Sequence, residues 1–180
     1  IAEAFTIDKD AEIAMEIDPR TIDKDKIGFI KMLGFNRISL GIQDFDEEVQ
    51  KHINRFQPLA QVRDIYEHCR SLDFASINFD LIYGLPHQSA ASFRETVKEV
   101  IALHPDRIAL YSFAYVPWLK KHQEKIDPAS LPSDNDKLDL FLNSREQLIA
   151  GGYDSIAMDH FALKEDELAK AFHDGKLYRN

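Results

Sequence analysis

Hydrophobic and polar positions recur along the chain in blocks that are typical of repeated strand–helix units. Four apolar, strand-like runs each end in polar residues, and a helical pattern follows each of them: residues 12–18, 37–43, 76–84 and 107–115. Such an alternation predicts a parallel sheet with helical crossovers. A fifth strand is expected at residues 153–159, where it delivers His160 and Phe161.

Capping residues mark the ends of the intervening helices. Thr21 or Asp23 can cap a helix that Gly34 closes at its C′ position. Ser133 with Asp136 resembles a capping pattern for a later helix, which ends at a Gly–Gly pair. Further helices are expected at about residues 59–72 and 91–104, with a short acidic helix after the fifth strand.

These elements indicate an α/β fold that is part of a (β/α) barrel, with about five mainly parallel strands and flanking helices. A typical eight-fold barrel has about 250 residues, more than the 180 of this chain. Residues 44–50 are expected to form an acidic turn after the second strand. The chain begins at Ile1 without an initiator Met, so we expect a fragment of a longer protein.

Parallel strands present their carboxyl ends to one shared edge of a sheet, where ligands bind. The polar residues expected to converge there are Glu16, Asp18, Gln43, Asp80 and Tyr115. Glu16 and Asp18 share a face of the first strand because side chains alternate along a strand. They can bind a ligand, or they can form a solvated strand end in which Asp18 caps the next turn.

Two polar residues interrupt strands that are otherwise apolar. Gln43 needs hydrogen-bond partners, which either a ligand or a neighbouring backbone group can provide. Asp80 must be paired, hydrogen-bonded or protonated if it is buried, and Arg55 and Arg37 are the candidate partners. An arginine can alternatively hold the carboxylate of a ligand.

The remaining candidate chemistry is sparse. Asp159 and His160 suggest acid–base or ligand contact, with a surface or capping pair as the alternative. The sequence contains no CxxC, HExxH or Cys/His cluster, so no metal site is expected. It also lacks the GxSxG, P-loop and GxGxxG motifs.

The bulk composition narrows the class of protein. With 44% hydrophobic and 29% charged residues the chain is expected to be globular, and its net charge of −9 argues against nucleic-acid binding. No apolar run approaches the roughly 20 residues that span a bilayer, and no signal peptide is apparent, so we expect no membrane partner and a cytoplasmic location. The single cysteine, Cys69, is expected to be buried in a helix.

Five segments of the chain resemble a known family. They are EIAMEIDPR, GFNRISLGIQDFDEEVQKHINR, INFDLIYGLPHQS, PDRIALYSFAYVP and SIAMDHFAL. In this order they are similar to the middle of oxygen-independent coproporphyrinogen III oxidase (coproporphyrinogen dehydrogenase), a radical S-adenosylmethionine (SAM) enzyme of haem biosynthesis. The related haem chaperones share GIQDF and NFDLIYGLP, whereas MDHFA is the narrower marker of the oxidase.

The resemblance implies that residues 1–180 are the central to C-terminal part of a partial (β/α)6 barrel. The family holds a [4Fe-4S] cluster and, in this branch, two SAM molecules, and the cluster-bound SAM is cleaved to a 5′-deoxyadenosyl radical. That radical abstracts hydrogen from the propionates of coproporphyrinogen III, and loss of carbon dioxide and an electron leaves the vinyl groups of protoporphyrinogen IX. The substrate implied is therefore a small-molecule porphyrinogen, while the electron donor and acceptor stay unassigned.

The resemblance also implies roles for individual residues. Glu16 matches a contact to the first, cluster-bound SAM, and Gln43, Arg55, Asp80 and Ala114 match contacts to the second. The CxxxCxxC cluster motif and the glycine-rich SAM loop of the family are absent from the chain, as is its C-terminal domain, and Cys69 matches no cluster ligand. The chain alone is therefore expected to be inactive and to bind no cluster, and no catalytic residue is assigned.

Two alternatives stay open. One is a haem chaperone of the same superfamily, which binds and delivers haem. The other is a non-radical (β/α) barrel enzyme that uses Asp80 and His160 as an acid–base pair. A further question is electrostatic, because coproporphyrinogen carries four propionates and the chain is acidic; Arg20, Arg37 or Arg55 are the basic groups expected to offset this, unless residues outside the chain do so.

Overall fold

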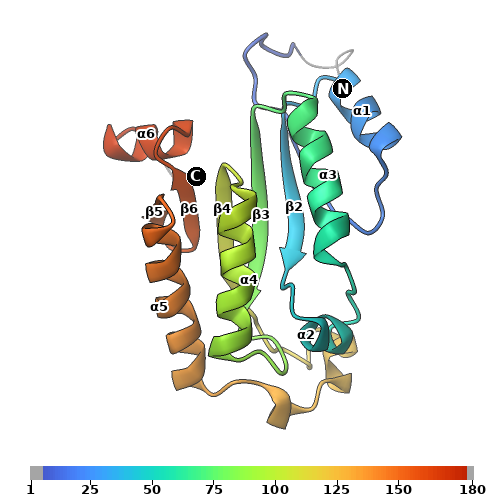
Figure 1. Ribbon diagram of the computed structural model, residues 1–180, viewed down its shortest axis with the longest axis vertical. Coiled ribbons are helices and arrows are strands. Elements are labelled where there is room, and N and C mark those ends of the chain that lie inside the picture. The colour runs from blue at the N-terminus through green and yellow to red at the C-terminus, as the bar shows by residue number, and fades with distance from the viewer. Residues whose placement is uncertain (1–5, 178–180) are drawn as a thin grey trace.

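Six strands form one sheet in the computed structural model, which describes residues 6–177 (Figure 1). The strands are β1 (Ala14–Ile17), β2 (Arg37–Gln43), β3 (Ser76–Tyr83), β4 (Arg107–Ser112), β5 (Tyr153–Ala157) and β6 (His160–Leu163). Their spatial order is β1-β2-β3-β4-β6-β5; β1 to β4 are parallel, and β6 lies antiparallel between β4 and β5. The sheet is open, with β1 and β5 as its edges in the described part of the chain.

Helices alternate with the strands and pack on one face of the sheet (Figure 1). They are α1 (Lys24–Met32), α2 (Glu47–His52), α3 (Leu59–Ser71), α4 (Ala90–Leu103), α5 (Asp134–Ala150) and α6 (Glu167–His173), with short 3₁₀ helices η1 (Lys121–Lys125) and η2 (Pro128–Ser130). Strand residues Leu40, Phe79 and Leu110 belong to the same buried cluster as Ile65 of α3 and Phe93 of α4. Removal of this apolar surface from water is the main force that holds helices and sheet together.

The expected α/β class is confirmed, and the structure differs from the sequence-based expectation at two places. Residues 44–50 are not a simple turn, because Asp46 accepts hydrogen bonds from the amides of Glu48 and Val49 and begins α2. The fifth strand ends at Ala157, and a tight turn at Met158, whose φ is +53°, returns the chain as β6. No glycine or proline marks this hairpin in the sequence.

The helix boundaries follow local capping chemistry, as expected. The Asp23 carboxylate accepts a hydrogen bond from the Lys26 amide at the start of α1. Gly34, with φ of +94°, follows the C-cap residue of that helix. Ser133 and Asp136 form a reciprocal capping box at the start of α5. Each cap satisfies backbone groups that the helix itself leaves unpaired.

The two faces of the parallel strands differ in chemistry. One face carries the apolar residues that pack under the helices. On the other face, which we call the inner face, Ser39 lies opposite Glu16 and Asn78 in the register, and Asp80 lies opposite Gly41 and Ala109. The period of two along each strand therefore gathers polar side chains from three strands on the inner face.

A buried carboxylate joins the carboxyl end of β2 to the neighbouring elements. Asp44 is fully buried and accepts hydrogen bonds from the Thr96 hydroxyl, from the Gln88 amide at 2.6 Å and from the Asp46 backbone at 2.9 Å. Gln88 in turn accepts a hydrogen bond from the Gly84 amide at 2.6 Å. Burial raises the pKa of Asp44, while these hydrogen bonds oppose the rise.

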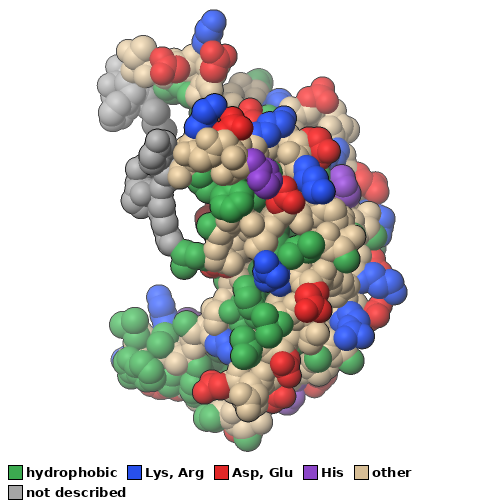
Figure 2. All heavy atoms as spheres, turned by 90° about the vertical axis from the view of Figure 1, so that its left-hand side faces the viewer, with side chains coloured by type: hydrophobic (Ala, Val, Ile, Leu, Met, Phe, Trp, Pro, Cys, Tyr) green, Lys and Arg blue, Asp and Glu red, His purple; other side chains and the backbone are tan. Residues whose placement is uncertain are grey.

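The flank formed by β5, α5 and α6 carries charged side chains of both signs with hydrophobic side chains among them (Figure 2). On α5 the exposed hydrophobic residues include Leu138, Leu142 and Ile149. Among residues 6–177, no helix combines the length and the hydropathy that crossing a membrane requires.

Replacement of Asp44 tests how far the buried network supports the fold. Asp44→Ala leaves the donors of Gln88, Thr96 and Asp46 without an acceptor, and we expect the free energy of unfolding to fall by about 3 kcal/mol in urea denaturation. Asp139→Ala, at an exposed position of α5, is the matched control and should change it by less than about 0.5 kcal/mol. Equal effects of the two substitutions would contradict this role of Asp44.

Candidate functional site

Asp80 lies on the inner face of β3 and is held by two neutral side chains. The Ser39 hydroxyl donates to its Oδ2 at 2.7 Å, and the Asn78 amide donates to its Oδ1 at 2.8 Å. Burial raises the pKa of Asp80, the two hydrogen bonds oppose the rise, and the charge of Glu16 adds to it. The prediction that Arg55 or Arg37 pairs with Asp80 is wrong, since within residues 6–177 neither arginine forms an ion pair with Asp80.

Arg37 lies at the amino end of β2, the opposite end of the sheet from the candidate site. Its Nε is 2.8 Å from a carboxylate oxygen of Glu12, and its Nη2 is 2.5 Å from one of Glu167. Arg107 pairs similarly with Asp166 at 2.8 Å. These ion pairs tie the start of α6 to the sheet, so Arg37 has a structural role and does not offset charge at the site.

Gln43 ends β2 in a rarely populated backbone conformation. The Asp44 amide donates to the Ile42 carbonyl at 2.9 Å, which closes a three-residue turn around Gln43, and φ of Gln43 is +65°. The register between β2 and β3 shifts at the same place. Backbone strain of this kind is concentrated at functional sites, where the surrounding structure maintains it.

Gly41, Gln43 and Arg55 form a cradle at this end of the sheet. A Cβ atom on Gly41 would lie 2.8 Å from Nη2 of Arg55 and 2.9 Å from Nε2 of Gln43, so a larger residue would displace the ends of these two side chains. Nη2 of Arg55 donates to the Gly41 carbonyl at 3.0 Å, and Nη1 lies 3.2 Å from Asp18. Its Nε is buried without a partner in the described residues, and burial lowers the pKa of Arg55.

Asp18 has the capping role that was one of its two alternatives. Its carboxylate accepts a hydrogen bond from the Arg20 amide at 3.0 Å and pairs with the Arg20 guanidinium at 2.7 Å. Hydrogen bonding to the Arg20 side chain lowers the pKa of Asp18, and the charge of Arg55 contributes. Glu16, two residues earlier, is exposed on the inner face.

A pocket of about 510 Å³ opens at the carboxyl ends of β2 and β3. Its lining includes Gln43 and Arg55, together with Phe113 after β4 and Lys125 of η1. No Asp or Glu among the described residues lines it. The pocket thus joins two of the expected site residues in surroundings that suit a carboxylate group.

Ala114 lies in an adjoining pocket of about 400 Å³, in a backbone segment that two side chains hold in place. Gln123 donates to the Ala114 carbonyl at 3.0 Å and accepts from the Val116 amide at 2.6 Å. Lys137 of α5 donates to the Phe113 carbonyl at 2.6 Å. These bonds give the backbone at Ala114 a defined position in the wall of this pocket.

Gly84 lets the Lys137 side chain cross the end of β3. Its φ is +85°, and a Cβ atom there would lie 2.6 Å from Cε of Lys137. Tyr115 lines the same pocket as Gly84 and Lys137. Tyr115 lies in the loop after β4, and none of the strand-end residues with which it was expected to converge lines this pocket.

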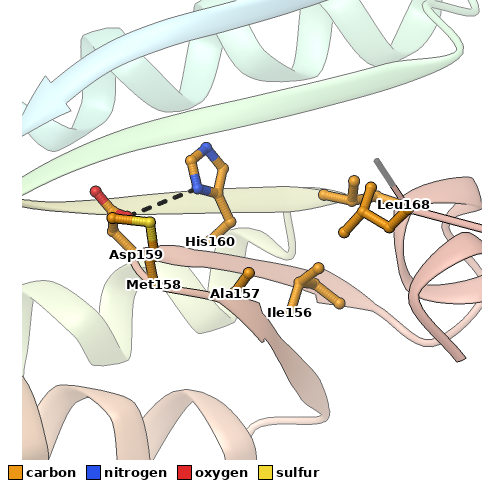
Figure 3. Close-up of a pocket in the computed structure, with 7 residues that line it drawn as sticks. Ile156, Ala157, Met158, Asp159, His160 and Leu168 are labelled. Carbon is orange, nitrogen blue, oxygen red and sulfur yellow. Dashed lines mark ion pairs between the residues drawn. The ribbon is translucent and has the colours of Figure 1, made fainter. Parts of the chain in front are cut away.

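Asp159 and His160 lie at the hairpin between β5 and β6 and line a third, mainly apolar pocket of about 230 Å³ (Figure 3). Nδ1 of His160 is 4.0 Å from the Asp159 carboxylate, and its ring packs edge-on against Tyr111 at 6.1 Å. His160 and Asp80 both lie opposite Ala109 in the register, so they share the inner face. Both oxygens of Asp80 are engaged by Ser39 and Asn78, and no hydrogen bond to His160 is present among the described residues.

The sequence profile of the radical SAM superfamily matches residues 1–100. The chain belongs to the radical SAM superfamily. Oxygen-independent coproporphyrinogen III oxidases from Synechocystis and Pseudomonas aeruginosa are 49% and 50% identical to it, over 100% and 96% of the chain. The structure of coproporphyrinogen III oxidase from Escherichia coli, a radical SAM enzyme, matches 99% of the chain with a TM-score of 0.97 and 44% identity.

The chain covers only part of these radical SAM proteins. It spans 39% of the Synechocystis relative, 38% of the Pseudomonas relative and 41% of the Escherichia coli structure. A radical SAM methyltransferase from Kitasatospora setae, solved with cobalamin and a [4Fe-4S] cluster, matches 58% of the chain at 12% identity and a TM-score of 0.53, which shows the fold alone.

Membership in the radical SAM superfamily implies SAM and a [4Fe-4S] cluster as cofactors. The cluster does not fit this chain, because its single cysteine, Cys69, is buried in α3, and burial raises the pKa of its thiol to about 11. SAM fits, because Gln43 and Arg55 line a pocket of about 510 Å³ and the buried Nε of Arg55 is a hydrogen-bond donor without a partner in the described residues.

Several residues that shape the site went unnoticed in the sequence. Ser39 and Asn78 lie on the same face of the sheet as Asp80. The alternation of polar residues along strands β2 and β3 could have indicated this. Gln123 and Lys137 gave no such signal, because they lie far from Ala114 in a loop and a helix. Their role follows only from the tertiary structure.

Asp80→Asn tests the cost of the buried carboxylate. Because burial raises the pKa of Asp80 above its unfolded value of 3.8, its contribution to stability is full below pH 3.8 and is lost as the pH rises through the folded pKa. The amide introduced by the substitution can keep both contacts, accepting from Asn78 and donating to Ser39. We therefore expect the stability of the variant relative to the parent chain to rise with pH from about 4 and then level off.

The measurement is urea denaturation of both proteins between about pH 3 and 8, with Asp139→Asn as the exposed control. A stability difference that is independent of pH, or that falls as the pH rises, would contradict the assigned environment of Asp80.

Proposed function

We propose that this chain is the central part of an oxygen-independent coproporphyrinogen III oxidase. The observation that carries the proposal is the match to the Escherichia coli enzyme, which extends over 99% of the chain at 44% identity. The reaction is the anaerobic, SAM-dependent oxidative decarboxylation of two propionates of coproporphyrinogen III to vinyl groups, which gives protoporphyrinogen IX for haem synthesis.

Five residues are proposed to bind two SAM molecules: Glu16 the first, cluster-bound SAM, and Gln43, Arg55, Asp80 and Ala114 the second. The cluster-bound SAM supplies hydrogen-atom abstraction when bound, and the residues of this chain position the two SAM molecules. The guanidinium of Arg55 has a buried Nε without a partner in the described residues and suits the carboxylate of the methionine part. The Glu16 carboxylate suits the ammonium group or ribose hydroxyl groups of the first SAM, the Asp80 carboxylate suits those of the second, and Ala114 offers backbone groups.

The rigidity of these residues supports the proposed role. Asp80 is fixed by Ser39 and Asn78, so its remaining acceptor capacity points in a defined direction. Gln123 and Lys137 hold the backbone on both sides of Ala114. A binding site whose polar groups are already held in place loses little conformational entropy when the ligand arrives.

We assign no ligand of the iron–sulfur cluster and no catalytic residue in this chain. Cys69 lies in the helix layer, among the apolar residues of the core cluster. The electron donor and acceptor also stay unassigned. The complete protein is proposed to bring the cluster to the carboxyl ends of the strands.

The haem-chaperone alternative is weighed against one local feature. The segment MDHFA is a more specific marker of the oxidases than the segments that the chaperones share, and it lies at the β5–β6 hairpin. The Asp159 carbonyl in this segment accepts a hydrogen bond from the Leu110 amide at 2.7 Å. The acid–base alternative has less support, because the structure gives Asp80 and His160 no hydrogen bond to each other in the described residues.

Arg55→Met tests the cofactor site. The substitution keeps much of the side-chain volume and removes the guanidinium, so we expect the dissociation constant of SAM, measured by isothermal titration calorimetry with the complete protein, to rise at least about tenfold. Arg145→Met, at an exposed position of α5, is the matched control and should leave the constant unchanged. Unaltered SAM binding by Arg55→Met would remove Arg55 from the site.

The reaction itself is tested by anaerobic incubation of the complete, cluster-reconstituted protein with coproporphyrinogen III, SAM and a reductant. We expect protoporphyrinogen IX and two equivalents of carbon dioxide, whereas the 180-residue chain should form no brown iron–sulfur species and no product because it has one cysteine. Tight haem binding without decarboxylation would favour the chaperone instead.

A further inference from the structure

The loop between β4 and α5 exposes large apolar side chains beside lysines. Trp118 is 80% exposed and Leu119 is 70% exposed, and Lys120 and Lys121 follow them directly. Tryptophan is highly buried on average, and neighbouring exposed apolar residues mark interaction sites. We call residues 118–125 the rim strap.

The rim strap is held firmly at its base. The amides of Leu119 and Lys120 both donate to the Val116 carbonyl at 2.9 Å. The Gln123 side chain accepts from the Val116 amide and donates to the Ala114 carbonyl. Trp118 therefore projects from a defined turn that follows Ala114 closely in the chain.

The rim strap passes beside the carboxyl ends of the strands. His122, Gln123 and Lys125 line the pocket of about 510 Å³ that also contains Gln43 and Arg55. In Figure 1 the segment between β4 and α5 runs at the same end of the sheet as α2, below the tip of β2. A ligand larger than SAM that enters at this end meets the rim strap.

The arginines expected to offset substrate charge are already engaged. Arg20 pairs with Asp18 at 2.7 Å, Arg55 contacts Asp18 at 3.2 Å, and Arg37 lies at the far end of the sheet. The lysines of the rim strap differ from them: Lys120, Lys121 and Lys125 form no ion pair with any residue in 6–177. Of these unpaired lysines Lys125 lines the pocket, and the rim strap also carries one carboxylate, Glu124, in a chain of net charge −9.

We propose that the rim strap binds the tetracarboxylate tetrapyrrole substrate, with Trp118 and Leu119 against its apolar ring system and Lys120, Lys121 and Lys125 paired with propionates. This inference rests on the proposed function and assigns the substrate to residues outside the SAM contacts. The pattern matches the ligand, because coproporphyrinogen combines an apolar macrocycle with anionic groups at its edge. Aromatic contact supplies most of the affinity, and the lysines select a polycarboxylate.

Trp118 is the single tryptophan of the chain, so its fluorescence reports on the rim strap directly. The experiment is an anaerobic titration of the 180-residue chain with coproporphyrinogen III, which is colourless and does not absorb the emission. We expect a saturable change in Trp118 emission. The affinity obtained from this titration should fall as the salt concentration rises. The combined variant Lys120→Gln, Lys121→Gln and Lys125→Gln should raise the dissociation constant about tenfold.

The matched control is Lys9→Gln, Lys164→Gln and Lys170→Gln, which removes the same charge from exposed positions outside the rim strap. It should keep the affinity of the parent chain within about twofold, because screened charges at a distance contribute little. An equal loss of affinity in both variants would show that net charge alone explains the effect, and it would overturn the proposal. No change in the Trp118 emission of the parent chain would overturn it as well.

The titration needs no turnover, so its outcome is separate from that of the proposed function. A complete protein that decarboxylates coproporphyrinogen III with an unchanged KM in the rim-strap variant would refute the rim strap and leave the function standing. A complete protein that binds the substrate through the rim strap without decarboxylating it would refute the function and leave the rim strap standing.

Discussion

The two-residue period of the parallel strands is the constraint on which the rest of the structure depends. Helices cover one face of the sheet, so alternate residues such as Leu40, Phe79 and Leu110 must be apolar. The intervening residues face the other side, where Ser39 and Asp80 occupy neighbouring strands. A carboxylate is tolerated there because both donors that it needs lie in the same phase, and a shift by one residue would exchange the two faces completely.

The carboxyl ends of the strands are fixed by a second layer of buried polar contacts. The Gln57 side chain donates hydrogen bonds to the carbonyls of Gly41 and Ile42. The Asp44 carboxylate accepts a hydrogen bond from the Gln88 amide, and the Gln88 side-chain oxygen accepts one from the Gly84 amide. These contacts maintain the unusual backbone at Gln43 and the close approach at Gly41. The scaffold therefore bears the strain of the cradle, and the groups proposed to meet the cofactor are positioned before it binds.

The sequence predicted what depends on local chemistry. Asp23 and Ser133 cap their helices because capping needs only residues three positions away. The sequence did not predict which residues pair across the fold. Arg37, for example, pairs with Glu167 of α6, which is 130 residues distant in the chain. The β5–β6 hairpin escaped for another reason, since Met158 adopts a positive φ that its residue type does not announce. Asp80 could be singled out as unusual, whereas its partners required the register of two strands.

Acidic and basic side chains of the site occupy different surroundings, which bears on the proposal that an acidic chain binds an anionic substrate. Glu16 and Asp80 lie on the inner face, where negative charge favours a sulfonium or ammonium group. Arg55 and Lys125 line the pocket at the strand ends; no described carboxylate lines this pocket, and the Asp18 carboxylate lies 3.2 Å from Arg55. Because the Debye length in physiological salt is about 8 Å, a propionate at the rim responds mainly to its nearest charges. The net charge of −9 therefore does not decide which ligand binds, and the local order of charges does.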